Sequence, residues 1–187
     1  RWSAYNAFTH RALCWAHLLR DFAAMEERHH SPWHGHRLGL LARRILGHWL
    51  HWKSGDIDRA TLTALTVPLR ARFETLLDQT SRNAPGEKAR GIARDLLGRT
   101  DELWRFLDDP LVHPTNNLAE RLLRYAVIYR KLSFGTDSPD GSRYIERLLT
   151  TAATLSLQNR NLVDYLTDGM TAFFAGKPAP SLLPAVA

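Results

Sequence analysis

Apolar residues recur at helical spacing through the middle of the chain. From Pro32 to Asp109 they return every three or four positions, which predicts a series of helices that each bury one face. The first of these stripes consists of Leu38, Leu41, Ala42, Ile45, Trp49 and Trp52. The pattern therefore favours a mostly helical fold.

Turn-forming residues divide this helical region. Ser54-Gly55-Asp56 interrupts the first stripe, and Pro68 is predicted to open a new helix, because proline is well tolerated at a first helical position. A turn at 82–86 precedes a further helix, which should end before Asp108-Asp109-Pro110. The apolar face of that helix is formed by Ile92, Leu96, Leu103 and Leu107.

The flanking regions are read in the same way. Residues 2–8 predict a short helical piece, and Ala12 to Trp15 predicts either a short buried strand or more helix, since periodicity does not separate the two. A helix should follow over 16–28. Near the other end, Leu162 to Phe173 predicts an amphipathic helix, and residues 176–187 look poorly ordered.

Composition narrows the classes of function. The 187 residues include 25 Lys and Arg against 19 Asp and Glu, giving a formal charge of +6, which favours an acidic partner such as nucleic acid. A single cysteine excludes an internal disulfide framework and agrees with a reducing compartment. We expect neither export nor membrane insertion, because no apolar run approaches the roughly 20 residues of a membrane span. The six tryptophans lie along helical stripes and favour core packing over base stacking.

The densest candidate chemistry lies at the start of a predicted helix after the extended connector 111–114. Asn117, Glu120, Arg121 and Arg124 fall at i, i+3, i+4 and i+7, which places them on one polar stripe. A carboxylate beside arginines could hold a divalent metal next to a polyanion. The alternative is a helix cap, in which Asn117 is the N-cap and Glu120 completes a capping box.

Further basic residues follow this stripe. Arginines could hold phosphate oxygens while the carboxylate holds Mg²⁺, although one carboxylate does not suffice for two metal ions. The alternative is a solvated helix face with internal ion pairs, such as Glu120 with Arg124. The basic residues of this region are Arg121, Arg124, Arg130, Lys131, Arg143 and Arg147.

Two other groups offer weaker chemistry. Six histidines between positions 29 and 51 could form a zinc site, but they lack cysteines at ligand spacing. Cys14 and His17 could form a thiol–imidazole pair, yet Cys14 lies in an apolar run and fits a small buried side chain better. Serine hydrolase, phosphate-loop and dinucleotide signatures are absent.

Two motifs resemble a known family. The stretch from Asn116 to Arg124, Asn-Asn-Leu-Ala-Glu-Arg-Leu-Leu-Arg, closely resembles the carboxyl-terminal catalytic region of insertion sequence 66 family transposases, as do the Arg130-Lys131 and Phe134-Gly135 pairs that follow. The Cys14-Trp-Ala-His17 run before a basic helix resembles a second motif of that family. The two motifs occur in the family's order, separated by a helical insert.

The resemblance implies a DDE transposase with a ribonuclease H-like core, which uses two Mg²⁺ or Mn²⁺ ions to cleave and transfer DNA strands. It places the catalytic, metal-binding glutamate on Glu120, with Asn116 and Asn117 in support. Our own hypothesis is that the six basic residues named above contact DNA. The family's two aspartates would lie upstream of Arg1, so the fragment alone should be inactive. The implied partners are transposon ends and target DNA, with a homo-oligomeric complete enzyme in the bacterial cytoplasm, associated with the nucleoid when bound to DNA.

The same resemblance implies a division of the chain. Residues 1–31 would end the ribonuclease H-like core with its last strand and a helix, and 32–110 would form a helical insertion. Residues 111–175 would carry the glutamate-bearing helix and the C-terminal helices of the core, and 176–187 a flexible tail. The alternative function is a helical DNA-binding or assembly module without catalysis.

Overall fold

The structure, a computed structural model, describes residues 10–183 and contains eight helices and no strand within that range. The predicted piece at residues 2–8 lies outside the described residues. The chain divides into two compact units, Arg1–Asn117 and Leu118–Ala187, each of which is considered by itself. The helices are α1 Trp15–Glu27, α2 Pro32–Lys53, α3 Arg59–Asn83, α4 Glu87–Leu97, α5 Thr100–Asp108, α6 Asn117–Ser133, α7 Pro139–Leu157 and α8 Leu162–Phe174. The mostly helical prediction is confirmed.

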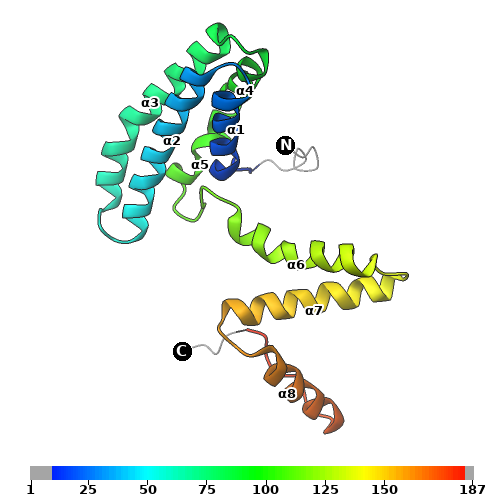
Figure 1. Cartoon of the computed structure of the whole chain (residues 1–187). Coiled ribbons are helices and arrows are strands. Elements are labelled where there is room, and N and C mark those ends of the chain that lie inside the picture. Colours follow the sequence, from blue (N-terminus) through cyan, green and yellow to red (C-terminus); the bar gives the residue numbers. More distant parts are fainter. Residues whose placement is uncertain (1–9, 184–187) are drawn as a thin grey trace. The chain divides into compact units, whose positions relative to one another are not determined.

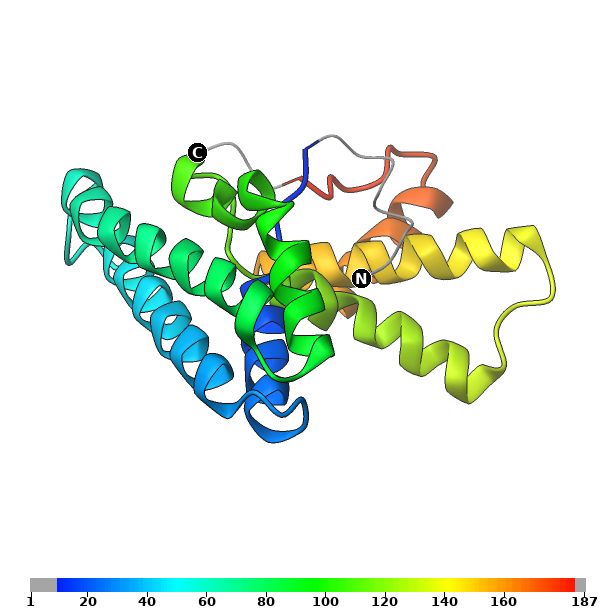
Figure 2. The same ribbon diagram turned by 90° about the horizontal axis from the view of Figure 1, so that it is seen from above.

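The first unit is organised around a long antiparallel helix pair. α2 and α3 run side by side, with α1 packed against α2 and α4 against α3 (Figures 1 and 2). The predicted α2 stripe turns inward, and Leu38, Ala42 and Ile45 are completely buried. This burial on each helix supplies the main free energy that holds the bundle together.

An aromatic cluster forms the centre of this core. The Trp15 ring is fully buried and lies 5.6 Å from the Phe73 ring, 5.3 Å from Trp104 and 5.2 Å from Phe106, measured between centroids. The Trp15 indole Nε1 donates a hydrogen bond of 3.0 Å to the Leu103 carbonyl. Tilted and edge-on ring contacts of this kind add to the gain from apolar burial. One aromatic side chain from α1 therefore joins α3 and α5.

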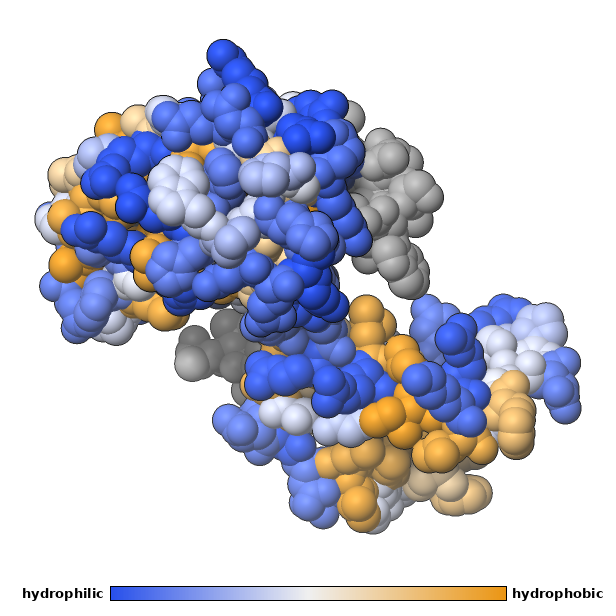
Figure 3. Space-filling view, turned by 45° about the horizontal axis from the view of Figure 1, so that its top comes forward, coloured by the Kyte–Doolittle hydropathy of each residue, from blue (hydrophilic) through white to orange (hydrophobic). Residues whose placement is uncertain are grey.

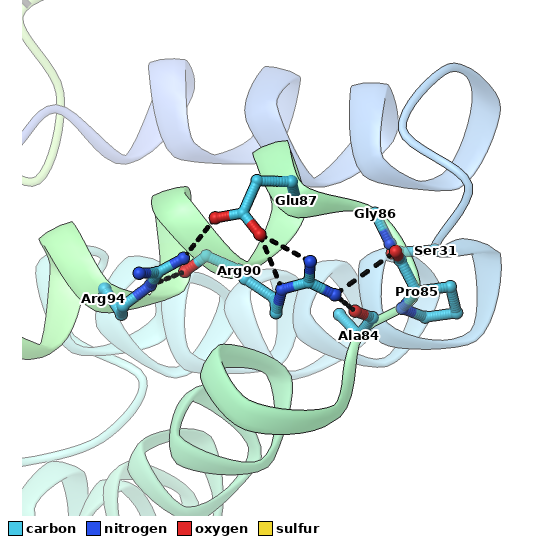
Figure 4. Close-up of polar contacts among 7 residues, drawn as sticks. All are labelled: Ser31, Ala84, Pro85, Gly86, Glu87, Arg90 and Arg94. Carbon is cyan, nitrogen blue, oxygen red and sulfur yellow. Dashed lines mark hydrogen bonds and ion pairs between the residues drawn. The ribbon is translucent and has the colours of Figure 1, made fainter.

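The turn between α3 and α4 is fixed against the loop that precedes α2 (Figure 4). The Gly86 amide donates to the Ser31 hydroxyl at 3.3 Å, and a Cβ atom at Gly86 would overlap the His29 carbonyl oxygen. Arg90 closes the turn from the other side, because its Nη1 donates to the Ala84 carbonyl at 2.5 Å. Only glycine fits where two backbone segments approach so closely.

Two predicted helix boundaries are wrong. Pro68 lies inside α3, which begins at Arg59 because the Asp58 side chain accepts the Thr61 amide at 2.7 Å and caps the helix there. The proline costs α3 one backbone hydrogen bond and leaves the helix continuous. The predicted single helix through Ile92 and Leu107 is divided at Gly98, which follows the end of α4 at Leu97, and α5 begins at Thr100.

The predicted strand does not form among the described residues. Residues 11–14 are assigned neither strand nor helix, and Trp15 is already the first residue of α1. The Leu13 amide donates to the Glu102 carbonyl at 3.0 Å, and the Trp15 amide donates to the Pro114 carbonyl at 2.8 Å. These backbone groups are satisfied by α5 and by the connector after it.

The second unit contains α6, α7 and α8. Phe134 and Gly135, with φ of 58° and 98°, turn the chain between α6 and α7, and the Ser138 hydroxyl caps α7 by accepting the Gly141 amide at 3.0 Å. Leu155 is its one buried side chain among the described residues. Apolar side chains gather on the surface of this unit (Figure 3).

The segment predicted to be a flexible tail makes hydrogen bonds over part of its length. The Tyr165 hydroxyl donates to the Pro180 carbonyl at 3.0 Å, and Gln158 Nε2 donates to the Leu182 carbonyl at 3.0 Å. Residues 180–182 are thus bonded to α8 and to the end of α7. None of the described helices is long and apolar enough to cross a membrane.

Candidate functional site

The two motifs singled out from the sequence meet in the first unit. The Asn116 amide donates to Cys14 Sγ over 3.4 Å, although 102 positions separate the residues. Beside this contact, the Trp15 amide donates to the Pro114 carbonyl at 2.8 Å. The start of α1 therefore fixes the connector that leads into α6.

Within the Cys14–His17 motif the side chains have different tasks. Trp15 is a core residue, and its rings and indole N–H are fully engaged inside the bundle. Cys14 is only partly buried, so the expectation of a fully buried thiol is wrong: its sulfur accepts the hydrogen bond from Asn116. His17 is exposed in the first turn of α1. The motif combines an anchor in the core with polar groups at the surface.

The residue at which α6 begins argues against Glu120 as part of a capping box. Asn117 is the first residue of α6, so the N-cap position belongs to Asn116, and Glu120 lies one residue beyond the position that a capping box requires. Glu120 and Arg121 are exposed. A carboxylate in the first turn is favoured by the helix dipole wherever it sits, so the position of Glu120 does not depend on a capping box.

The predicted basic residues all lie exposed on two helices of the second unit. Arg124 lies on α6, and Arg130 and Lys131 lie in its last turn. Arg143 and Arg147 are one turn apart on α7, and Arg143 forms an exposed ion pair of 3.4 Å with Asp140. Such a pair in solvent is weak, so it leaves the guanidinium accessible to a stronger anion.

The histidine-rich region does not assemble a zinc site. Among the described residues, no three ligand atoms of the histidines between 29 and 51 come close enough to hold one ion. Instead His36 Nδ1 lies 3.2 Å from Glu26 Oε1, and His51 Nδ1 lies 2.9 Å from Asp56 Oδ2. Burial lowers the pKa of His34 and of His48, and the nearby Arg44 charge lowers that of His48 further.

Two aspartates between α2 and α3 have structural tasks. The Asp56 carboxylate accepts the Ser54 hydroxyl at 2.8 Å in the turn after α2, and its pKa is lowered by hydrogen bonds from His51 and Ser54. Asp58 caps α3, and the hydrogen bonds from Thr61 lower its pKa as well. Both carboxylates therefore stabilise the connection between α2 and α3.

The junction of the two motifs carries the resemblance to DDE transposases, and comparison of the whole sequence agrees with it. Residues 1–144 match the profile of the Transposase IS66 family, well over half of the chain. The chain belongs to the IS66 transposase family.

A curated relative is much longer than this chain. The chain is 25% identical over 178 residues to the uncharacterized protein y4qI of Sinorhizobium fredii strain NGR234. The match includes 90% of this chain and 32% of the relative, so the chain spans about a third of that protein's length. No solved structure matches the sequence.

Proposed function

We propose that the chain forms part of a DNA transposase that cleaves and transfers DNA strands, and that Glu120 is one of its metal-binding catalytic carboxylates. The observation that carries the proposal is the hydrogen bond between Cys14 and Asn116. It joins two motifs from distant parts of the sequence at the entry to the helix that bears Glu120. Membership of the IS66 transposase family supports the same reaction class.

The donor atoms near the start of α6 suit a hard divalent cation. Mg²⁺ and Mn²⁺ prefer carboxylate and amide oxygens, and Glu120 with the side chains of Asn116 and Asn117 provides that set within five positions. Two such ions, when bound, would activate the attacking water or DNA 3′-hydroxyl and stabilise charge on the phosphate.

The arginines of α6 and α7 would act on the DNA itself. Arg121 and Arg124 follow Glu120 at one and four positions, which suits guanidinium groups that hold phosphate oxygens beside the reacting bond. Arg130, Lys131, Arg143 and Arg147 would hold the DNA backbone without reading its sequence. These contacts orient the phosphodiester for in-line attack.

Two more carboxylates are required for two metal ions. Asp56 and Asp58 are engaged in the turn after α2, so they are poor candidates. We expect the two aspartates in a part of the longer protein that this chain does not span, and the 187-residue chain alone to be inactive. The proposed partners are the transposon ends and target DNA in the bacterial cytoplasm. Joining two ends calls for a homo-oligomer.

The test uses the longer protein that contains this chain, with a plasmid that carries the transposon ends. With Mg²⁺ or Mn²⁺ we expect strand cleavage, and Glu120→Gln should lower its rate at least about 100-fold, because the amide keeps the shape and loses the charge that binds metal. Glu146→Gln removes an exposed carboxylate from α7 and should retain the wild-type rate. Full activity of Glu120→Gln would refute the assignment.

A DNA-binding module without catalysis is the second candidate, and the exposed pair Arg143 and Arg147 on α7 favours it. In that case the longer protein would show no metal-dependent cleavage. Binding would still weaken with salt and with neutralisation of those arginines, and Glu120→Gln would leave every DNA transaction unchanged.

A further inference from the structure

The pair of long helices in the first unit carries an unusual distribution of charge. α2 contains Arg37, Arg43, Arg44 and Lys53 and not one Asp or Glu. Between α2 and α3 the surface is hollowed into a groove of about 490 Å³. Its polar and aromatic lining consists of Trp33, Arg37 and Arg44 from α2 and Arg72, Thr75 and Gln79 from α3.

The three arginines of this groove are available to a ligand. Other arginines of α3 are engaged, since Arg70 pairs with Glu74 at 3.2 Å and Arg82 pairs with Asp78 at 2.7 Å. The ion pairs found in the described part of the chain do not include Arg37, Arg44 or Arg72, and all three are exposed. No carboxylate lines the groove, so it is a local site of positive potential.

Trp33 departs from the prediction that tryptophans serve the core. Trp15 and Trp104 are fully buried, whereas Trp33, which lines the groove, is 53% exposed. The Arg37 guanidinium carbon lies 5.3 Å from the centre of the Trp33 ring. An exposed aromatic ring beside unpaired guanidinium groups is the combination that binds single-stranded nucleic acid, through base stacking and phosphate contacts.

We propose that the α2–α3 groove binds a single-stranded DNA segment, with Arg37, Arg44 and Arg72 on its phosphates and Trp33 stacked on an unpaired base. A groove of 490 Å³ is within the roughly 300–1,000 Å³ of small-ligand pockets, a size that suits individual nucleotide units of a flexible strand. The choice of DNA over RNA rests on the proposed function. The site itself does not involve Glu120 or a metal ion.

Arg37 and Arg44 are seven residues apart on one helix, which separates them by about 10 Å along its axis. Arg72, Thr75 and Gln79 face them from α3, so donors line both walls. A flexible strand lying in the groove would meet arginines on two sides, and its affinity would depend strongly on salt, because each neutralised phosphate releases counterions.

The experiment measures binding of the 187-residue chain to a fluorescent oligothymidine of about 20 nucleotides by anisotropy across a salt series, without divalent metal. The triple variant Arg37→Gln, Arg44→Gln, Arg72→Gln should weaken binding at least about tenfold. It should also reduce the slope of log affinity against log salt by about 2, because each phosphate contact on a single strand contributes roughly 0.7 to that slope. A control triple variant removes the same charge from exposed positions outside the groove and should leave the salt slope unchanged. It consists of Arg28→Gln, Arg43→Gln and Arg82→Gln.

Trp33 gives a second, charge-neutral readout. Trp33→Ala should weaken oligothymidine binding about fivefold or more, Trp33→Phe should restore part of it, and neither should alter binding of a blunt duplex. Circular dichroism and thermal midpoints confirm that the variants fold. Equal loss in the two triple variants, or equal loss of duplex and single-strand binding in Trp33→Ala, would overturn the proposal. Oligoribothymidine binding tenfold tighter than oligothymidine would overturn the choice of DNA.

A negative result for DNA binding in the groove can be distinguished from a negative result for the proposed strand cleavage. Loss of oligothymidine binding in the groove triple variant would stand even if the longer protein showed no strand cleavage, because the groove does not include Glu120. Conversely, loss of strand cleavage in Glu120→Gln would stand even if the groove variants bound normally.

Discussion

The two units differ in how far they bury their large apolar side chains. The first unit buries a continuous cluster that includes Trp15, Phe73 and Trp104 at zero exposure. The second leaves large side chains such as Leu132, Tyr144 and Phe173 more than 60% exposed, and its apolar surface is visible in Figure 3. Because apolar burial is the main driving force of folding, the first unit has its own source of stability and the second has little of one.

The difference also separates two kinds of motif residue. In the first unit, Trp15 belongs to a family motif yet acts through packing, and it holds the connector to α6 in place by its backbone amide. In the second unit, Glu120 and Arg121 are exposed polar residues, to which the proposed function assigns a metal ion and DNA phosphates. Substitutions should therefore divide into those that unfold the protein and those that disable it.

The largest expected effect comes from the core. Trp15→Ala should lower the free energy of unfolding by about 3–5 kcal/mol, since it removes a buried indole and leaves a cavity among aromatic rings. Phe134→Ala in the second unit should stay within about 0.5 kcal/mol, because that ring is 97% exposed. Urea unfolding followed by circular dichroism measures both, and similar losses in the two variants would contradict the contrast between the units.

A smaller loss is expected where two turns meet. Gly86→Ala should cost about 1–3 kcal/mol, because the added methyl group overlaps the His29 carbonyl and the loop must shift. Gly91→Ala is the matched control: it lies inside α4 with open space around it, and alanine there should stabilise the protein by about 0.5–1 kcal/mol. Thermal unfolding of the two variants should shift in opposite directions.

The smallest effect is a dependence on pH. Glu87 accepts Arg90 Nε at 2.9 Å and Arg94 Nη2 at 2.5 Å, and these hydrogen bonds, the one from Arg90 first, lower its pKa. A lowered carboxyl pKa stabilises the folded protein above the unfolded pKa of about 4.3, and this contribution is lost as pH falls through the folded value. The thermal midpoint of Glu87→Gln should lie slightly below that of the wild type at pH 7.

This difference should disappear on acidification. The two midpoints should converge once the pH falls below the lowered pKa of Glu87 in the folded wild type, where that carboxyl is protonated and its bonds to the arginines no longer involve a charge on position 87. Glu146→Gln on α7 serves as the control for the loss of one negative charge from an exposed position. A constant offset between Glu87→Gln and the wild type across the range would rule out the ion pairs as the cause.

Much of the fold could be predicted from the sequence, because helical periodicity and breakers are local signals. The turn at Gly55, the start of α6 at Asn117 and the extent of α8 follow from such signals. The prediction that Pro68 opens a helix is wrong because an equally local signal, the cap at Asp58, comes earlier and sets where α3 begins. The division at Gly98 depends on how α4 and α5 pack, which a continuous stripe does not reveal.

The candidate site was predictable only in part. Both motifs were found by pattern, but their contact was not, because the bond between Cys14 and Asn116 depends on how the whole bundle folds. The exposure of Trp33 was missed for a similar reason. Its place next to a helical stripe predicts burial, whereas in the structure the ring lies at the surface beside Arg37. A stretch of 28 residues without an acid, from 28 to 55, was the available signal.

The turn at Gly55 is a suitable place to insert a label into this protein. Its φ of 85° places it at the tip of the connection between α2 and α3, and the space around it is open. An epitope or a fluorescent label inserted after this residue would join two helix ends that are already close, without entering the core. The same insertion at Gly86 would force apart two backbone segments that touch. A tagged chain for tracking the protein in living cells is therefore best built at the first turn.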